Sequence, residues 1–204
     1  RAQPGPRRLP VYVEPMQLTR QRITEAALGI LAEYGLADVS MRRVASSLGV
    51  APGALYWHIA SKQELIACMG EAIVQQLLDG PLPDPARLSA ELRGAVLGVR
   101  DGAEVVIAAM SQPHARVQGA IEARFTASVQ AAVGEAASAS NARIVGQALL
   151  HLTLGSAAVH QSAAQLARAT RAADAGRADV DEAAGEAEHA AAVEFLLDGL
   201  KQSG

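Results

Sequence analysis

The stretch from Ser40 to Leu65 constrains the fold of this chain more than any other part of it. It reads SMRRVASSLGVAPGALYWHIASKQEL. Apolar residues at helical spacing lead to Gly49, which can adopt the left-handed conformation that a tight turn requires. A second short helix is predicted from about Pro52 to Trp57, because proline fits the first turn of a helix. Two short helices joined by a glycine-containing turn are typical of a helix-turn-helix, whose second helix reads the DNA major groove.

The rest of the sequence predicts an all-α fold. A helix is expected from Thr19 to Tyr34, Ser40 is expected to cap the next one, and Ser61 with Glu64 forms a capping box for the helix that follows. The proline-rich segment 79–85 cannot continue a helix and marks a boundary. No convincing strand or repeat is present. Beyond the boundary, helices are expected near 86–99, 101–111, 114–134, 141–169 and 182–200, with a loop over 170–181.

Composition agrees with closely packed helices in a cytoplasmic protein. Of 204 residues, 50% are apolar and only 3% aromatic, and abundant alanine favours helix over sheet. The single cysteine, Cys68, excludes an internal disulfide and is expected to be an inert core thiol. No uninterrupted apolar run approaches the roughly 20 residues that cross a bilayer, and the first residues lack the apolar core of a secretory signal. We therefore expect no membrane partner.

Charge is distributed unevenly along the chain. The net charge is −3, yet residues 1–66 carry eight Lys or Arg against five Asp or Glu, while the remainder carries ten against sixteen. A basic end on an acidic body suits a DNA-binding head, although chance scatter in an acidic protein would look similar. The proline-rich arm places Arg1, Arg7 and Arg8 where they could enter a minor groove, but solvated charges on a mobile tail are the favoured interpretation.

The residues of the motif resemble the tetracycline-repressor (TetR) family of bacterial regulators. The segments Ser40-Met-Arg-Arg-Val-Ala and Leu48-Gly-Val-x-x-x-x-Leu-Tyr-Trp-His-x-x-x-Lys62 match that family's N-terminal motif, and the Tyr-Trp-His form is closest to the tetracycline repressors themselves. Weaker likeness lies in 100–105 and 151–155. The resemblance implies an N-terminal three-helix helix-turn-helix domain and a C-terminal helical domain for ligand binding and dimerisation. We expect an extended arm over 1–17, the DNA-binding domain over 18–66, and the ligand-binding and dimerisation domain over 67–204.

The resemblance also implies which residues read bases. Arg42 matches an arginine that hydrogen-bonds guanine in the family, and a forked guanidinium suits guanine O6 and N7. A phosphate contact or pairing with an acid is the alternative. Small residues at the base-reading positions offer few hydrogen bonds and differ from the tetracycline repressors, so a different operator is expected. These positions are Pro52, Gly53 and Ala54.

Other residues of the motif are expected to hold the DNA backbone. Tyr56, His58 and Lys62 match residues that contact phosphates. Trp57 has two interpretations: packing against the protein core, or contact with the DNA backbone. Packing is the favoured one. One short helix reads few base pairs, so a homodimer on a palindromic operator in double-stranded DNA is expected. The complete predicted DNA-binding set is Ser40, Arg42, Pro52, Gly53, Ala54, Tyr56, Trp57, His58 and Lys62.

The family's C-terminal helices imply a dimer interface through 141–169 and 182–200, and a pocket whose ligand shifts the DNA-binding heads. The pocket departs from the tetracycline repressors: the histidine that helps hold magnesium there falls at Val106, and other polar positions fall at Leu78, Leu88 and Val159. Apolar side chains cannot ligate a hard cation. We therefore expect a more apolar effector, of unknown identity. The candidate lining residues, each of which could equally be ordinary core, are Leu88, Leu92, Val106, Met110, Phe125 and His151.

Nothing in the sequence indicates catalysis, a metal or a cofactor. His151 and His160 are nine residues apart, not the spacing of paired metal ligands on a helix, and no phosphate loop or nucleophile motif appears. Asp101 and Glu104 could pair as acids, but a solvated helix face is the favoured interpretation. The predicted function is a ligand-responsive repressor and not an enzyme. The alternatives are an activating or ligand-independent regulator, or a ligand-carrying helical protein without operator binding.

Overall fold

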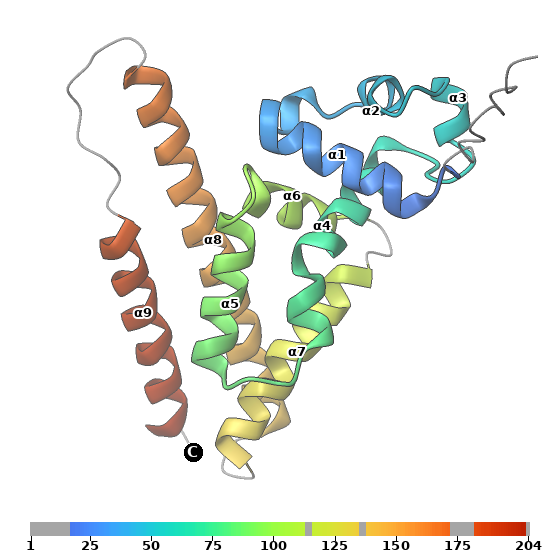
Figure 1. Cartoon of the computed structure of the whole chain (residues 1–204). Coiled ribbons are helices and arrows are strands. Elements are labelled where there is room, and N and C mark those ends of the chain that lie inside the picture. The colour runs from blue at the N-terminus through green and yellow to red at the C-terminus, as the bar shows by residue number, and fades with distance from the viewer. Residues whose placement is uncertain (1–16, 113–115, 135–137, 172–181, 203–204) are drawn as a thin grey trace, which may run out of the picture.

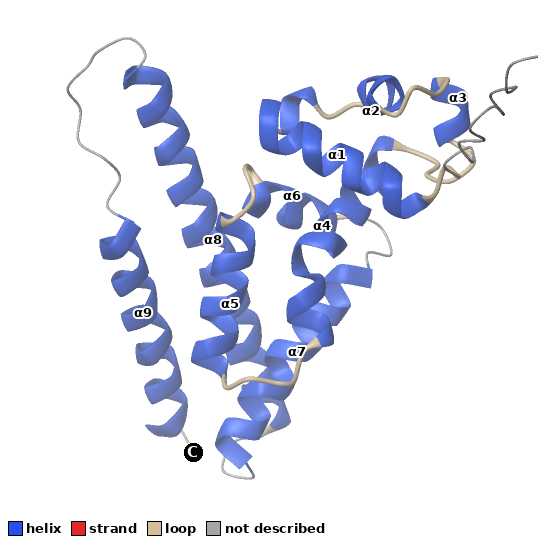
Figure 2. Cartoon of the chain, viewed as in Figure 1, coloured by secondary structure: helices blue, strands red, loops and turns tan. Residues whose placement is uncertain are grey.

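The computed structural model describes residues 17–112, 116–134, 138–171 and 182–202. Over these residues the fold is all-α, as predicted (Figure 2). A small head made of α1–α3 sits on a body of longer helices, and α4 runs from one into the other (Figure 1). The basic arm with Arg1, Arg7 and Arg8, most of the predicted loop 170–181, and His114 lie outside the described residues. The elements are α1 (Arg20–Tyr34), the 3₁₀ turn η1 (Leu36–Asp38), α2 (Met41–Ser47), α3 (Pro52–Leu55), α4 (Lys62–Asp79), α5 (Pro85–Leu97), α6 (Gly102–Met110), α7 (Arg116–Val133), α8 (Ala139–Arg171) and α9 (Glu182–Gln202).

The predicted helix starts are confirmed by their capping hydrogen bonds. The side-chain oxygen of Ser40 accepts the N–H of Arg43 at 3.2 Å, and that of Ser61 accepts the N–H of Glu64 at 3.1 Å. The Glu64 carboxylate in turn accepts the N–H of Ala60 at 2.6 Å, which completes the capping box one residue before the cap. Each cap of this kind stabilises a helix by about 1 kcal/mol.

The head has its own apolar core. Leu55 and Ile59, predicted as core residues, are fully buried there, together with Ile23 and Leu31 of α1 and Val44 of α2. The same cluster takes in Leu65, Cys68 and Met69 from the first turns of α4. Burial of each large aliphatic side chain contributes about 1.5–3 kcal/mol, so this cluster holds three short helices that would not be stable alone.

The body core lies between α5, α7 and α8, and α6 joins it to the head. Val106 on α6 belongs to the body core, whereas its neighbour Val105 belongs to the core of the head. At the crossing of α4 and α6, a Cβ added to Gly70 would lie 2.4 Å from the Cβ of Ala109. Only glycine allows the two helices to approach so closely, and the head therefore rests firmly on α6.

Residues 139–168 of α8 are long and apolar enough to cross a membrane by length and composition. The segment contains no uninterrupted apolar run of about 20 residues, as expected, and it meets the criterion through its mean hydropathy. Core helices of globular proteins often share this property, and α8 packs against α5, α6, α7 and α9. The buried side chains of α8 therefore contribute to the body core.

Candidate nucleic-acid interface

The turn between α2 and α3 has the predicted geometry. Gly49 adopts φ +67°, and the N–H of Val50 bonds to the carbonyl of Ala45 at 3.0 Å. Pro52 stands in the first turn of α3, as expected. The helix is shorter than predicted, because it ends at Leu55, whose carbonyl accepts the N–H groups of both His58 and Ile59 at 2.9 Å. Residues 56–58 therefore form a turn that returns Ile59 to the core.

The predicted base-reading residues lie on the outer surface of the head. Arg42, Pro52 and Gly53 are exposed and Ala54 is half-buried. The Arg42 guanidinium makes no hydrogen bond or ion pair within the described part of the chain, so the alternative interpretation, pairing with an acid, is not observed. Ser40 is half-buried, and its hydroxyl is already engaged in capping α2.

The neighbouring Arg43 has a different environment, which sequence reasoning missed. Its guanidinium forms an ion pair with Asp38 and lies 3.9 Å from the centroid of the Tyr34 ring. This cation–π contact connects α2 to the end of α1. Of these two adjacent arginines, Arg43 therefore stabilises the contact between α1 and α2, whereas Arg42 faces outward.

Trp57 is 90% exposed, so the interpretation that it mainly packs is wrong. Tyr56 is about half exposed, and His58 and Lys62 are exposed beside it. The large aromatic surface of a tryptophan is costly to leave in water, and its indole N–H can donate to a phosphate oxygen. Lys62 is the first residue of α4, where the helix N-terminus adds to its positive potential. The surface suits an anionic, partly apolar partner.

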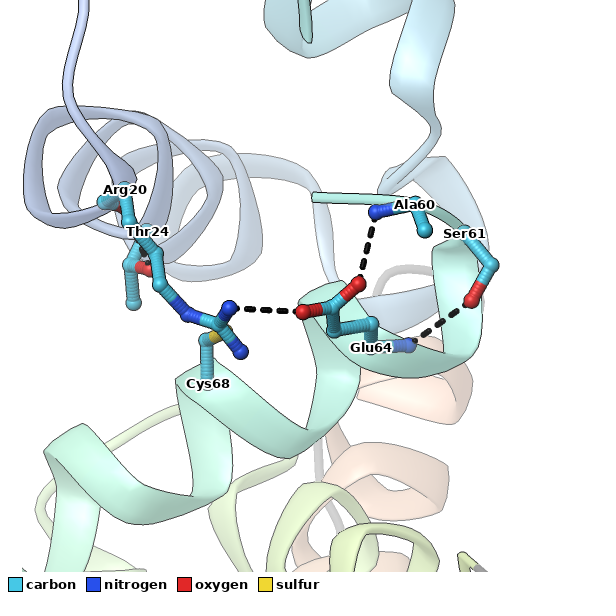
Figure 3. A network of polar contacts seen from close by, with 6 residues as sticks. All are labelled: Arg20, Thr24, Ala60, Ser61, Glu64 and Cys68. Carbon is cyan, nitrogen blue, oxygen red and sulfur yellow. Dashed lines mark hydrogen bonds and ion pairs between the residues drawn. The ribbon is translucent and has the colours of Figure 1, made fainter. Parts of the chain in front are cut away.

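A polar network connects the first turn of α1 to the first turns of α4 (Figure 3). The Arg20 guanidinium donates to Glu64 Oε1 at 2.6 Å and to the Cys68 sulfur at 3.1 Å. The hydrogen bond from the N–H of Ala60 is the main cause that lowers the pKa of Glu64. Burial raises the pKa of the Cys68 thiol, and the prediction of a buried core thiol is confirmed. The network joins α1 to α4, the two helices that flank α2 and α3 in the chain.

The loop between α5 and α6 connects the body to the head. Asp101 is buried at φ +55°, and its Oδ2 accepts the N–H of Leu36 at 2.7 Å. Its Oδ1 accepts a hydrogen bond from Gln165 of α8, and next to it Arg100 donates to the carbonyl of Glu33 at 2.8 Å. The expectation of a solvated acidic face is therefore wrong for Asp101, although Glu104 is exposed. One carboxylate links α8 to the head.

The predicted effector residues fall into two groups. Leu88, Leu92, Val106 and Phe125 are fully buried in the body core. Met110 and His151 instead line a surface pocket of about 530 Å³. The six residues therefore do not converge on one described cavity.

The chain resembles known regulatory proteins in sequence and in fold. The family profile "Bacterial regulatory proteins, tetR family" matches residues 23–69. The class D tetracycline repressor protein of Escherichia coli is 31% identical over 97 residues, which make up 44% of this chain and 44% of that protein. The match thus spans less than half of that curated relative. The crystal structure of Mycobacterium smegmatis BioQ has a TM-score of 0.75 at 30% identity, covering 92% of this chain and 100% of that chain. BioQ with its natural double-stranded DNA operator has a TM-score of 0.73 at 27% identity, covering 91% and 99%.

Proposed function

The chain belongs to the TetR family of bacterial regulatory proteins, and we propose that it is a homodimeric repressor that binds a palindromic operator and leaves it when a small, largely apolar effector binds. The observation that carries this proposal is the outer surface of α3 and the turn after it. Buried Leu55 and Ile59 hold that surface rigidly, while Trp57 is almost fully exposed. A relative of the same fold has been crystallised with its double-stranded DNA operator, which supports the same use of the head here.

A dimer follows from the size of the reading element. An α3 of four residues is about 6 Å long, which is enough for only a few base pairs, so specificity requires two heads on two half-sites. Exposed apolar side chains on α8 and α9 support a two-fold interface through these helices, because such residues on neighbouring helices favour burial against a second copy. They are Ile144, Val159, Leu166 and Phe195.

The effector is proposed to act on the body, among residues that include Leu88, Leu92, Val106, Met110, Phe125 and His151. A change there has a short physical route to the head through Asp101, which contacts both Gln165 and Leu36. Allosteric coupling typically amounts to about 1–3 kcal/mol, enough to change operator affinity about 5–150-fold. Bacterial repressors of this kind act on cytoplasmic DNA, and we propose that location.

The direct test is a footprint on the DNA upstream of the protein's own gene. Wild-type protein is expected to protect a palindrome at moderate salt. Trp57→Ala is expected to weaken binding at least tenfold with an unchanged Tm, because the side chain has almost no packing to lose. Leu82→Ala, which removes an exposed apolar residue of the α4–α5 loop, is the matched control and should bind as wild type. Absence of sequence-selective binding would overturn the proposal.

A further inference from the structure

A pocket of about 680 Å³ lies where α9 packs beside α5 and α8, an arrangement visible in Figure 1. This volume is typical of small-molecule sites. Its walls are mostly apolar, with Leu152, Val159 and Ala163 on α8 and Ala192 on α9. Of the predicted effector residues, only His151 lines it. The pocket therefore offers an apolar site separate from the buried body core.

The buried charged group in this pocket is Arg93 of α5. Its side chain is only 7% exposed, and its Nε has no hydrogen-bond partner. No ion pair of the described residues involves its guanidinium either. A buried cation without a counter-charge destabilises the folded state. A protein that keeps such an arginine beside a cavity has a ready site for an anion.

The other polar groups around the pocket do not supply that anion. His189 is buried and lies 3.3 Å from Ser156 Oγ and 3.4 Å from Thr153 Oγ1. Burial, and then the charge of Arg93, lowers the pKa of His189, so its imidazole is neutral at pH 7. Glu188 also lines the pocket, but it is exposed and forms no ion pair with Arg93. Among the described residues, no negative charge compensates the buried guanidinium of Arg93 in this pocket.

Gly185 keeps the space beside the guanidinium open. A Cβ at this position would lie 3.4 Å from Nδ1 of His160 and 3.5 Å from Nη2 of Arg93. A larger side chain at position 185 would occupy the space beside the guanidinium, where an anion that binds Arg93 would lie. The glycine thus preserves access to the buried guanidinium of Arg93.

We propose that this pocket binds a small apolar molecule bearing one carboxylate, with the carboxylate on the Arg93 guanidinium and the apolar part along Leu152, Val159 and Ala192. A planar carboxylate matches the guanidinium fork through two parallel hydrogen bonds. A phosphate dianion would bring a second negative charge that no other buried cation balances. This inference rests on the proposed function, because it gives the effector its chemical class. It also places the effector in the pocket between α5, α8 and α9, which shares only His151 with the six residues proposed above.

The test measures binding of octanoate, benzoate and indole-3-acetate to the full chain by calorimetry and thermal shift, with octanamide as the uncharged match for octanoate. At least one acid is expected to bind and to raise Tm, and octanamide is expected to bind at least tenfold more weakly than octanoate. Arg93→Met should lose the effect of the acids while its own Tm equals or exceeds that of wild type, because the buried charge is gone. Gly185→Leu should lose binding with Arg93 still present.

Arg87→Met is the control, because Arg87 lies on the same helix but is exposed and paired with Glu91. It should bind the acids as wild type does. The inference is overturned if none of the acids binds, if octanamide matches octanoate, or if Arg93→Met keeps the response. If Arg93→Met keeps acid binding and also dissociates the dimer, the partner of the Arg93 guanidinium is an anionic group of the second copy. That result would likewise overturn the inference. Operator binding is measured separately, so a protein that binds the acids but no duplex contradicts only the proposed function.

Discussion

At the scale of single residues, Arg42 and Lys62 share an exposed surface but have different expected roles. We propose that Arg42 meets a guanine edge, and that Lys62, the first residue of α4, contacts the DNA backbone. Arg42→Ala is expected to reduce discrimination at one base position by about 1–3 kcal/mol. Lys62→Ala should weaken all sequences similarly and reduce the salt slope by about 0.9 for each head, or about 1.8 for a dimer. Titrations of single-base operator variants at several salt concentrations measure both effects, and identical behaviour of the two variants would contradict this division.

Glu64 makes the stability of the head depend on pH. The N–H of Ala60 is the main cause that holds the pKa of this carboxyl below its ordinary value near 4.5. The unfolded chain therefore binds a proton at a higher pH than the folded chain does, and stability decreases as pH falls through about 4.5 toward the lowered value. Glu64→Gln should remove this part of the decrease while lowering the Tm at pH 7. Thermal melts between pH 3 and pH 7 test it, and parallel curves for the two proteins would contradict it.

At the scale of elements, the α5–α6 loop connects α8 to the head through a buried side chain. Asp101→Asn preserves tolerance of the left-handed conformation but removes the charge from the bonds to Leu36 and Gln165. A charge-assisted hydrogen bond contributes about 1.5–3 kcal/mol, and we expect a loss of this size in the free energy of unfolding.

The same substitution is expected to reduce effector-induced release of the operator, measured by fluorescence anisotropy, with DNA affinity of the effector-free protein changed less. Glu104→Gln alters an exposed acid on the neighbouring α6 and serves as the control. If the two variants lost release equally, Asp101 would not be the link between body and head.

At the scale of the whole molecule, we propose that the exposed apolar side chains of α8 and α9 form the dimer interface. Phe195 is 80% exposed in the single chain, which is costly unless a second copy covers it. Phe195→Asp is expected to shift the protein from dimer to monomer in size-exclusion chromatography with light scattering, and to reduce operator affinity by at least a hundredfold. Leu82→Asp, on the α4–α5 loop, should remain dimeric. A dimeric Phe195→Asp protein would place the interface elsewhere.

The sequence predicted most of the architecture because helix starts, turns and breaks depend on local interactions. Caps at Ser40 and Ser61, the positive φ of Gly49 and the proline-rich break after Asp79 each act within a few residues. The limits of α3 were less predictable, because Ile59 must return to a core built by distant helices. The predicted DNA-facing residues were found from a motif, and most of them are indeed exposed.

What the sequence by itself determined is the set of helices and the surface that is predicted to face DNA. Only the tertiary structure decided that Trp57 faces water, that Asp101 bonds to Leu36, and that Arg93 is buried beside an open pocket. Helical periodicity shows which residues share a face, but not which other element covers that face. Whether a charged side chain is paired, or an aromatic ring is buried, depends on contacts between helices that lie tens of residues apart in the chain. Those contacts form only when the helices pack against one another.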